Sequence, residues 1–366
     1  PLVYFSHRTY ARIVSGAPPE QHGKDVLELV RYYLGRNSGL FIAVLYWLAI
    51  VPTVLIYGIS ITNVVDSFIV NQLGGPGISR YILAPLCVGL MTLALAFGNA
   101  IMLKIAQFVV YPLIVALAAV SLYLIPQWDL GSFMEAGDHT AGGVIKAIIL
   151  ILPVLVFSFS FVAAISQFSL GMEKEYGADH HAQSDKVIRN SAILLTVFTM
   201  FFVWSCALAM GADGMQEAND KNLPVLSYFA NETGTPFMAY MAPIVVICAV
   251  ASSYFGHALG TIEGTQYLFN LAAPKATKKM STRTLDLWTY LFIFIATSLV
   301  GIFNPSILDM ISVVGGVFFA FMTYLLPIWV IYRVEALARF RGKKTNFFVA
   351  IMGLIVLFAT IWGMFQ

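Results

Sequence analysis

The sequence predicts an all-α integral membrane protein that crosses the bilayer many times. Of its 366 residues, 59% are hydrophobic and only 11% are charged, against roughly 45–50% and about 25% in ordinary soluble domains. The apolar residues form long continuous runs, whereas membrane β-barrels alternate over stretches of about ten residues. The formal net charge is only +2, which excludes the strongly basic surface expected of a nucleic-acid-binding protein. The lipid bilayer is therefore the predicted partner of most of the surface.

Windows without charged residues give the predicted spans in chain order. A helix needs about 20 residues to cross about 30 Å of hydrocarbon. Nine charge-free windows of at least 22 residues meet this need: 37–65, 81–103, 105–128, 147–172, 190–212, 233–262, 287–308, 310–332 and 345–366. Residues 1–16, which open on PLVYFSHRTYAR without an initiator Met, have the pattern of the exit end of one further helix. We expect that the natural N-terminus precedes this sequence.

Lys and Arg are divided unequally between the loops on the two sides. One set of alternating loops, 8–36, 104, 173–189, 263–286 and 333–344, carries 18 of the 21 basic residues. The other set carries only Arg80, Lys146 and Lys221. The positive-inside rule places the first set in the cytoplasm and the C-terminus on the opposite side. Within the first set, residues 17–35 have apolar positions at helical spacing, which predicts a short interfacial helix.

Cysteine and histidine patterns give no support for a metal site or an enzyme. Cys87, Cys206 and Cys248 fall inside hydrophobic runs without metal-ligand spacing, so we interpret them as small apolar packing residues. His180 and His181 fall in a predicted loop and read as solvated surface. No phosphate-binding loop of the GxxxxGK[ST] type and no GxSxG nucleophile motif occurs. A membrane enzyme is therefore not indicated.

Hydroxyls interrupt the apolar window 147–172 in the stretch VFSFSFVAAISQFS. Ser158, Ser160 and Ser166 follow Pro153 near the middle of this window. Transporters often hold their substrate near the membrane midplane, at helices whose backbone is interrupted. Serine also bends helices by hydrogen-bonding to its own backbone, so a packed kink is the structural alternative.

Three further clusters of polar or small residues lie within predicted spans. VASSYFGHALG contains Ser252, Ser253 and His257, with glycines at small-xxx-small spacing that more often serve helix packing. YGISITNVVDSF contains Tyr57 and Ser60. A third stretch, ISVVGGVFFAF, places two glycines inside a span, where they favour either close packing or local unwinding. These glycines are Gly315 and Gly316.

The same stretches, in the same order, resemble a known family. ISITNVVDSF (59–68), PVLVFSFSF (153–161), FGHALGTIEG (255–264) and NPSILDMISVVGG (304–316) are similar to the serine/threonine branch of the hydroxy and aromatic amino acid permease family, in the amino acid/polyamine/organocation superfamily. The resemblance covers nearly the whole chain as one transporter domain. It implies a LeuT-like five-plus-five inverted-repeat fold with an eleventh helix. Residues 1–16 would then end span 2, and the nine windows would be spans 3 to 11.

This resemblance implies secondary active import of a small neutral amino acid across a bacterial inner membrane, with the C-terminus periplasmic. Span 6 (147–172) would be one of two broken helices, and its symmetry partner, span 1, is missing from this sequence. The implied substrate site consists of Phe157, Ser158, Phe159, Ser160, Phe161, Ser166, Tyr57 and Ser60. The implied ion-coupling residues are Ser252, Ser253 and His257, and Gly315 and Gly316 would form a gate.

Two departures from the family pattern leave the substrate and the ion open. Ser160–Ala163 stand where the family carries a polar or His residue and then Pro, which makes the pocket more apolar and favours an aromatic or larger apolar amino acid as the alternative. Ser252 stands where relatives carry Lys, and its hydroxyl with that of Ser253 would suit Na⁺, although H⁺ is the family default. Beyond the co-transported ion no cofactor is expected, and the oligomeric state is not predicted. A passive channel and a non-transporting amino acid receptor remain the alternatives of another class.

Overall fold

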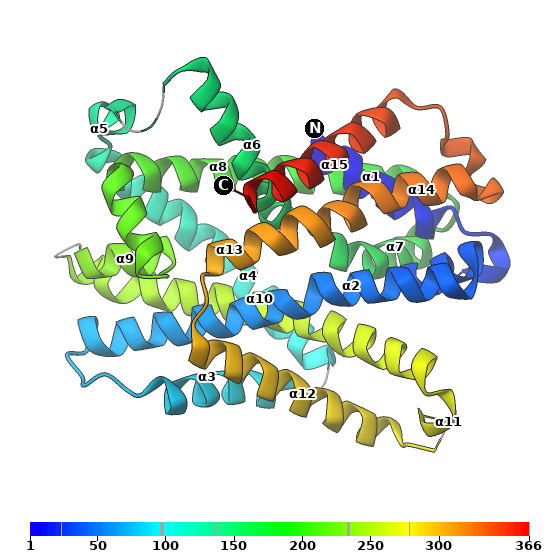
Figure 1. Cartoon of the computed structure of the whole chain (residues 1–366), viewed down its shortest axis with the longest axis horizontal. Helices are drawn as coiled ribbons and strands as arrows, with labels where there is room; N and C mark the ends of the chain where they lie inside the picture. Colours follow the sequence, from blue (N-terminus) through cyan, green and yellow to red (C-terminus); the bar gives the residue numbers. More distant parts are fainter. Residues whose placement is uncertain are drawn as a thin grey trace.

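The computed structural model describes residues 1–22, 24–95, 99–135, 137, 139–232, 235–277 and 279–365, and all regular secondary structure in these residues is helical (Figure 1). Eight helical segments of the described residues are long and apolar enough to cross a membrane. The fifteen α-helices of these residues are α1 Leu2–Ser15, α2 Val26–Ser67, α3 Arg80–Leu95, α4 Asn99–Leu124, α5 Leu130–Glu135, α6 Ala141–Ser158, α7 Val162–Tyr176, α8 His180–Asp220, α9 Val225–Glu232, α10 Pro236–Ala272, α11 Pro274–Thr277, α12 Thr282–Phe303, α13 Ile307–Val313, α14 Leu326–Arg333 and α15 Lys344–Gly363.

Several helices continue past the charge-free windows. α2 begins at Val26, where the Asp25 carboxylate accepts a hydrogen bond from the Glu28 backbone N–H at 2.8 Å, and it bends at Gly35, whose φ is +82°. The segment 17–35, predicted as an interfacial helix, contains the 3₁₀ turn Pro19–Gln21 and the part of α2 that precedes the non-helical Gly35. α4 begins at Asn99, before Lys104, because one lysine does not end a helix even where it ends a charge-free window.

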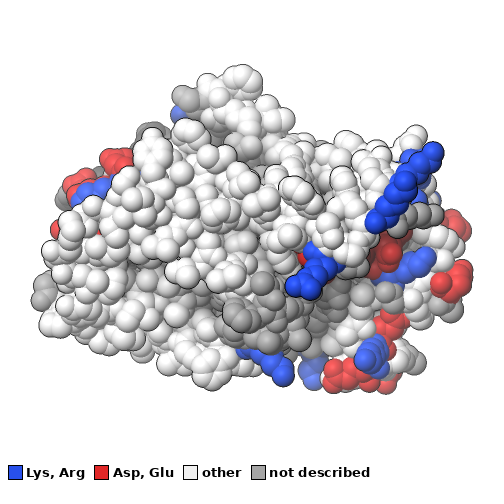
Figure 2. Space-filling view, turned by 90° about the horizontal axis from the view of Figure 1, so that it is seen from below, with Lys and Arg blue, Asp and Glu red and all other residues white. Residues whose placement is uncertain are grey.

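The connections between the long helices gather at the two ends of the bundle. The loops α1–α2, α10–α12 and α14–α15 lie at one end, on the right in Figure 1, and the connections α2–α3 and α12–α13 lie at the other. Figure 2 shows that the middle of one long face is almost free of charged side chains. This distribution suits a multi-pass membrane protein, with apolar residues facing lipid and charges at the two aqueous surfaces.

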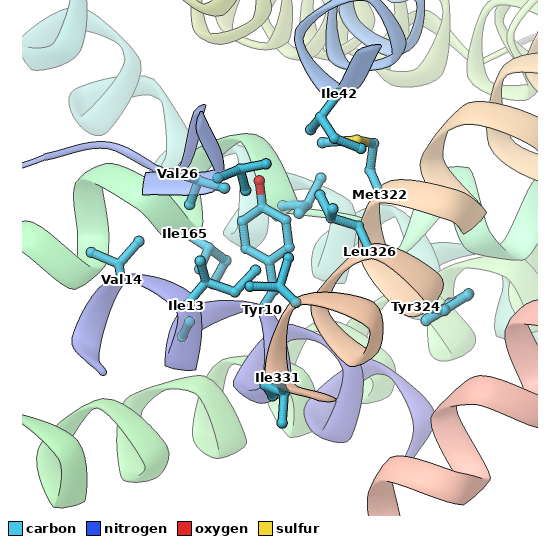
Figure 3. Packing of buried hydrophobic residues seen from close by; sticks show 14 of the residues in the cluster. Tyr10, Ile13, Val14, Val26, Ile42, Ile165, Met322, Tyr324, Leu326 and Ile331 are labelled. Carbon is cyan, nitrogen blue, oxygen red and sulfur yellow. The ribbon is translucent and has the colours of Figure 1, made fainter. Parts of the chain in front are cut away.

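Two buried clusters hold the helices in place. One joins α1, α7 and α14 around Tyr10, Ile165 and Ile331 (Figure 3). The other joins α2, α3 and α10 around Val54, Leu83 and Tyr254. α7 is therefore anchored in the first cluster and α10 in the second.

Candidate functional site

The apolar helix around residue 160 is broken. α6 ends at Ser158 and α7 begins at Val162, and Phe159 (φ −101°, ψ 4°) and Phe161 (φ −119°, ψ 28°) leave the helical region. The Ser158 hydroxyl donates to the Val154 carbonyl oxygen at 2.8 Å, a bond that favours bending of the helix. Each new helix end leaves backbone groups without an intrahelical partner. The break therefore exposes polar backbone in the middle of an apolar segment.

His7 of α1 holds one of these freed backbone groups. The Phe161 N–H donates to His7 Nε2 at 3.0 Å, and His7 Nδ1 lies 2.8 Å from the Val3 carbonyl oxygen. Because a carbonyl only accepts and an N–H only donates, the imidazole is neutral and carries its proton on Nδ1. The His7 ring also stacks on the Phe161 ring at 3.8 Å and 18°. His7 is not among the site residues predicted from the sequence. The polar run SHRTY within a predicted helix was the available signal.

Two predicted serines link the halves of the broken helix to other elements. The Ser160 hydroxyl lies 3.4 Å from Thr323 Oγ1, which belongs to the π-helical turn Phe321–Leu325 between α13 and α14. Ser166 accepts a hydrogen bond from the Val26 backbone N–H at 3.1 Å, at the start of α2. Ser160 and Ser166 therefore fix the position of the break through contacts with other elements.

One cavity lies on the α6 side of the break. We call it the α9 cavity; it measures about 410 Å³ and is lined by Tyr57, Ser60 and Phe157 with apolar residues of α9, α10 and α13. Three residues predicted for the substrate site therefore meet in one space. Asn222 also lines it, from the connection between α8 and α9.

A second cavity lies on the α7 side of the break. We call it the α1 cavity; it measures about 250 Å³, and Val162, Ala163 and Ser166 of α7 form one wall. The other walls carry hydroxyls, carboxamides and carboxylates, contributed by Tyr10, Asp25, Glu28, Tyr46, Glu263, Gln266, Tyr267 and Asn270. The break thus separates two cavities, one lined by the last turn of α6 and the other by the first turn of α7.

The α1 cavity has complementary features for both ends of an amino acid. Asp25, Glu28 and Glu263 form no ion pair among the described residues, so no basic side chain there neutralises the charge that would attract an ammonium group. The first N–H groups of α7, at Val162 and Ala163, lack intrahelical acceptors and favour a carboxylate. Tyr10 is only 1% exposed, and its hydroxyl has no hydrogen-bond partner in the described part of the chain. This hydroxyl points away from Ile331 (Figure 3).

The predicted ion-coupling residues form a separate cluster. The Tyr57 and His257 rings lie 5.4 Å apart, and His257 Nδ1 lies 3.0 Å from the Ser253 carbonyl oxygen. The Ser252 hydroxyl donates to the Ala249 carbonyl oxygen at 3.0 Å. Neither serine nor His257 lines the two cavities, so their role with an ion stays a prediction.

Gly315 and Gly316 lie in the π-helical turn Val314–Phe319. A Cβ on Gly315 would collide with the carbonyl oxygen of Pro153 and with Phe157 of α6, and a Cβ on Gly316 would collide with Thr360 of α15. Close packing accounts for both glycines. π-helical turns often occur at functional sites, and a role of these residues as a gate stays a prediction.

An amide cluster that the sequence analysis missed lies beside the α9 cavity. Asn63 Nδ2 donates to the Asn222 carbonyl oxygen at 2.8 Å and to Asn304 Oδ1 at 3.0 Å. Arg80 Nη1 donates to Asn63 Oδ1 at 2.7 Å, and Arg80 Nη2 donates to the Gly301 carbonyl oxygen at 2.6 Å. His180 and His181, interpreted from the sequence as solvated surface, are half-buried, since His180 Nε2 lies 3.2 Å from the Ser15 carbonyl oxygen and the His181 ring contacts Phe340.

Comparison with known proteins identifies a family. Residues 6–366 match the family model described as "Transmembrane amino acid transporter protein". The chain is similar to the serine transporter SdaC of Escherichia coli strain K12, with 35% identity over 372 residues, 100% of this chain and 86% of that protein. It is also similar to the threonine/serine transporter TdcC of Escherichia fergusonii, with 34% identity over 389 residues, 100% of this chain and 86% of that protein. TdcC of Yersinia enterocolitica is 34% identical over 384 residues, 99% of this chain and 86% of that protein. These matches confirm the family predicted from the motifs, and its members are transporters rather than enzymes.

Proposed function

Because this chain belongs to the transmembrane amino acid transporter family, we propose that it is a secondary active importer of a small neutral amino acid of the serine and threonine class. The observation that carries the proposal is the position of the break at Phe159–Phe161 between the α9 cavity and the α1 cavity. Transporters with interrupted helices bind substrate at such a break and expose it to each side in turn. The relatives named as serine and threonine/serine transporters support the amino acid class.

The chemistry of the two cavities suits a zwitterion that passes the break. The substrate enters the α9 cavity, where the hydroxyls of Tyr57 and Ser60 are available for hydrogen bonds. Its carboxylate then approaches the first turn of α7, where the unpaired N–H groups and the positive end of the helix dipole attract it. Its ammonium group is attracted by Glu263 and Asp25 in the α1 cavity, and release follows toward the end of the molecule that is rich in Lys and Arg.

The proposed fold is the five-plus-five inverted repeat with an added eleventh helix. In this assignment the α6–α7 pair is the broken first helix of the second repeat. The break, the C-terminal helix α15 and the alternation of basic loops support it. It places the basic loops in the cytoplasm of a bacterial cell and the C-terminus in the periplasm.

Uptake is proposed to be coupled to a cation, H⁺ or Na⁺. The hydroxyls of Ser252 and Ser253 are hard oxygen ligands of the kind that Na⁺ prefers. The alternative substrate is an aromatic or larger apolar amino acid, which is favoured by the size of the α9 cavity, about 410 Å³, and by its apolar lining from Ile56, Val246 and Ile311.

The test is uptake of radiolabelled L-serine into proteoliposomes that contain the full-length protein, with an inward H⁺ or an inward Na⁺ gradient imposed separately. Accumulation above equilibrium under one gradient supports the proposal and identifies the ion. Loss of Na⁺-driven uptake in Ser252→Ala with Ser253→Ala would support the sodium site. Gradient-driven uptake of labelled L-tryptophan, with no uptake of L-serine, would favour the aromatic alternative. Flux that ignores both gradients would indicate a channel, and binding without flux would indicate a receptor.

A further inference from the structure

A groove opens on the outside of the helical bundle between α10 and α12, which contact each other. It measures about 340 Å³ and is lined almost entirely by apolar side chains, among them Phe269, Leu285, Trp288 and Phe292. Trp288 is 61% exposed at this surface. The groove lies apart from the two cavities at the break, because it shares no lining residue with either of them.

Basic residues lie at the end of this groove. Lys275 of α11, Lys279 of the turn that follows it and Arg283 at the start of α12 are all exposed, and Met280, the neighbour of Lys279, lines the groove itself. None of the three forms an ion pair among the described residues. The single acidic residue of segment 264–286 is Asp286, whose Oδ1 accepts a hydrogen bond from Gln266 Nε2 at 2.6 Å.

We propose that the groove between α10 and α12 binds one anionic phospholipid, with an acyl chain against Trp288 and Phe292 and the phosphate group near Lys275, Lys279 and Arg283. Apolar grooves that face lipid accept any acyl chain, so selection must come from the headgroup. Unpaired basic residues at the membrane surface select anionic headgroups, and tryptophan concentrates at that interface. The proposal requires no assumption about the direction of transport or the transported amino acid.

The test uses quenching of Trp288 fluorescence by lipids with brominated acyl chains. The full-length protein and its Trp288→Phe variant are reconstituted with brominated phosphatidylglycerol or brominated phosphatidylcholine, and the difference between the two proteins gives the Trp288 component. We expect this component to favour phosphatidylglycerol by about five-fold or more, since each basic residue near anionic lipid contributes a factor of about five. Lys275→Gln with Lys279→Gln and Arg283→Gln should bring the preference close to one.

A matched triple variant separates a local site from general surface charge. Arg333→Gln, Lys343→Gln and Lys344→Gln remove the same charge at the same end of the molecule, from exposed positions on the α14–α15 side. This control should keep the preference for phosphatidylglycerol. Equal quenching by the two lipids in the parent protein, or an equal loss of preference in both triple variants, would overturn the proposal. All substitutions exchange exposed side chains, and elution as a single species checks that each variant is folded.

Discussion

The side chains of Asn222 and Asn304 are hydrogen-bonded to each other, and both residues have a positive φ. Asn222 Nδ2 donates to Asn304 Oδ1 at 3.0 Å, and the φ values are +53° and +51°. Asn304 ends α12 in the left-handed conformation, and its N–H donates to the Val300 carbonyl oxygen. Asn222 Oδ1 accepts from the Ile307 backbone N–H at 2.9 Å, at the start of α13. The pair therefore joins the end of one span to the start of the next, beside the α9 cavity.

Replacement of Asn304 should destabilise the protein at this junction. Asn304→Ala leaves alanine, which has no side-chain amide, in the left-handed region. It also removes the oxygen that accepts hydrogen bonds from the side chains of Asn63 and Asn222. The expected loss is about 2–3 kcal/mol, from about 1–2 kcal/mol of backbone strain and about 1 kcal/mol for hydrogen bonds. Thermal unfolding in detergent measures it. Asn304→Gly, which tolerates positive φ, should recover most of the strain term, and equal midpoints for the two variants would contradict the assignment.

Removal of the His7 acceptor should slow transport. In the parent protein the Phe161 N–H donates to His7 Nε2 at 3.0 Å. His7→Phe keeps an aromatic ring against Phe161 but leaves this N–H without an acceptor. A buried unsatisfied N–H costs about 1–3 kcal/mol, so the break should rearrange and the initial rate of uptake should fall at least about five-fold. Labelled L-serine uptake per amount of folded protein gives the rate. His22→Phe, at a histidine on the surface, is the control, and an unchanged rate in His7→Phe would show that this bond does not position the break.

The sequence predicts the helical class, the family and the stretch in which the helix breaks, because long apolar runs and hydroxyl clusters are local signals. It could not predict that His7 holds Phe161, since that contact joins α1 to α7 across 154 residues. Asn222 and Asn304 have no local sequence signal for their joint role, which is shown by their positive φ values and their hydrogen bond. For Gly315 the sequence left close packing and local unwinding open. The structure shows close packing against Pro153, which depends on how closely two helices approach. Contacts between distant helices are therefore what sequence patterns leave open.

The stability of the protein should decrease as the pH falls below about 6.5 because of His181. Burial, with the nearby His180, Arg339 and Arg12, lowers the pKa of His181 from 6.5 to about 4, and its Nε2 lies 3.0 Å from Arg339 Nη2. Between pH 6.5 and about 4, His181 is therefore protonated in the unfolded chain and neutral in the folded chain. The contribution of His181 to stability is fully present above pH 6.5 and is lost as the pH falls through this window. Thermal midpoints at pH 7.5 and 5 should differ less in His181→Gln than in the parent, and an equal difference would refute the assignment.

Neutralisation of Glu263 should weaken substrate binding from the side of the α1 cavity. Glu263 lines this cavity with Asp25 and forms no ion pair among the described residues, so the proposed ammonium contact is its main polar interaction there. A hydrogen bond to a charged group contributes about 1.5–3 kcal/mol, and Glu263→Gln keeps the shape while removing the charge. The apparent KM for efflux of L-serine from preloaded proteoliposomes should rise about ten-fold. Glu175→Gln removes an exposed carboxylate from α7 outside the cavity and should leave this KM unchanged. If both variants behave alike, the α1 cavity does not hold the substrate during release.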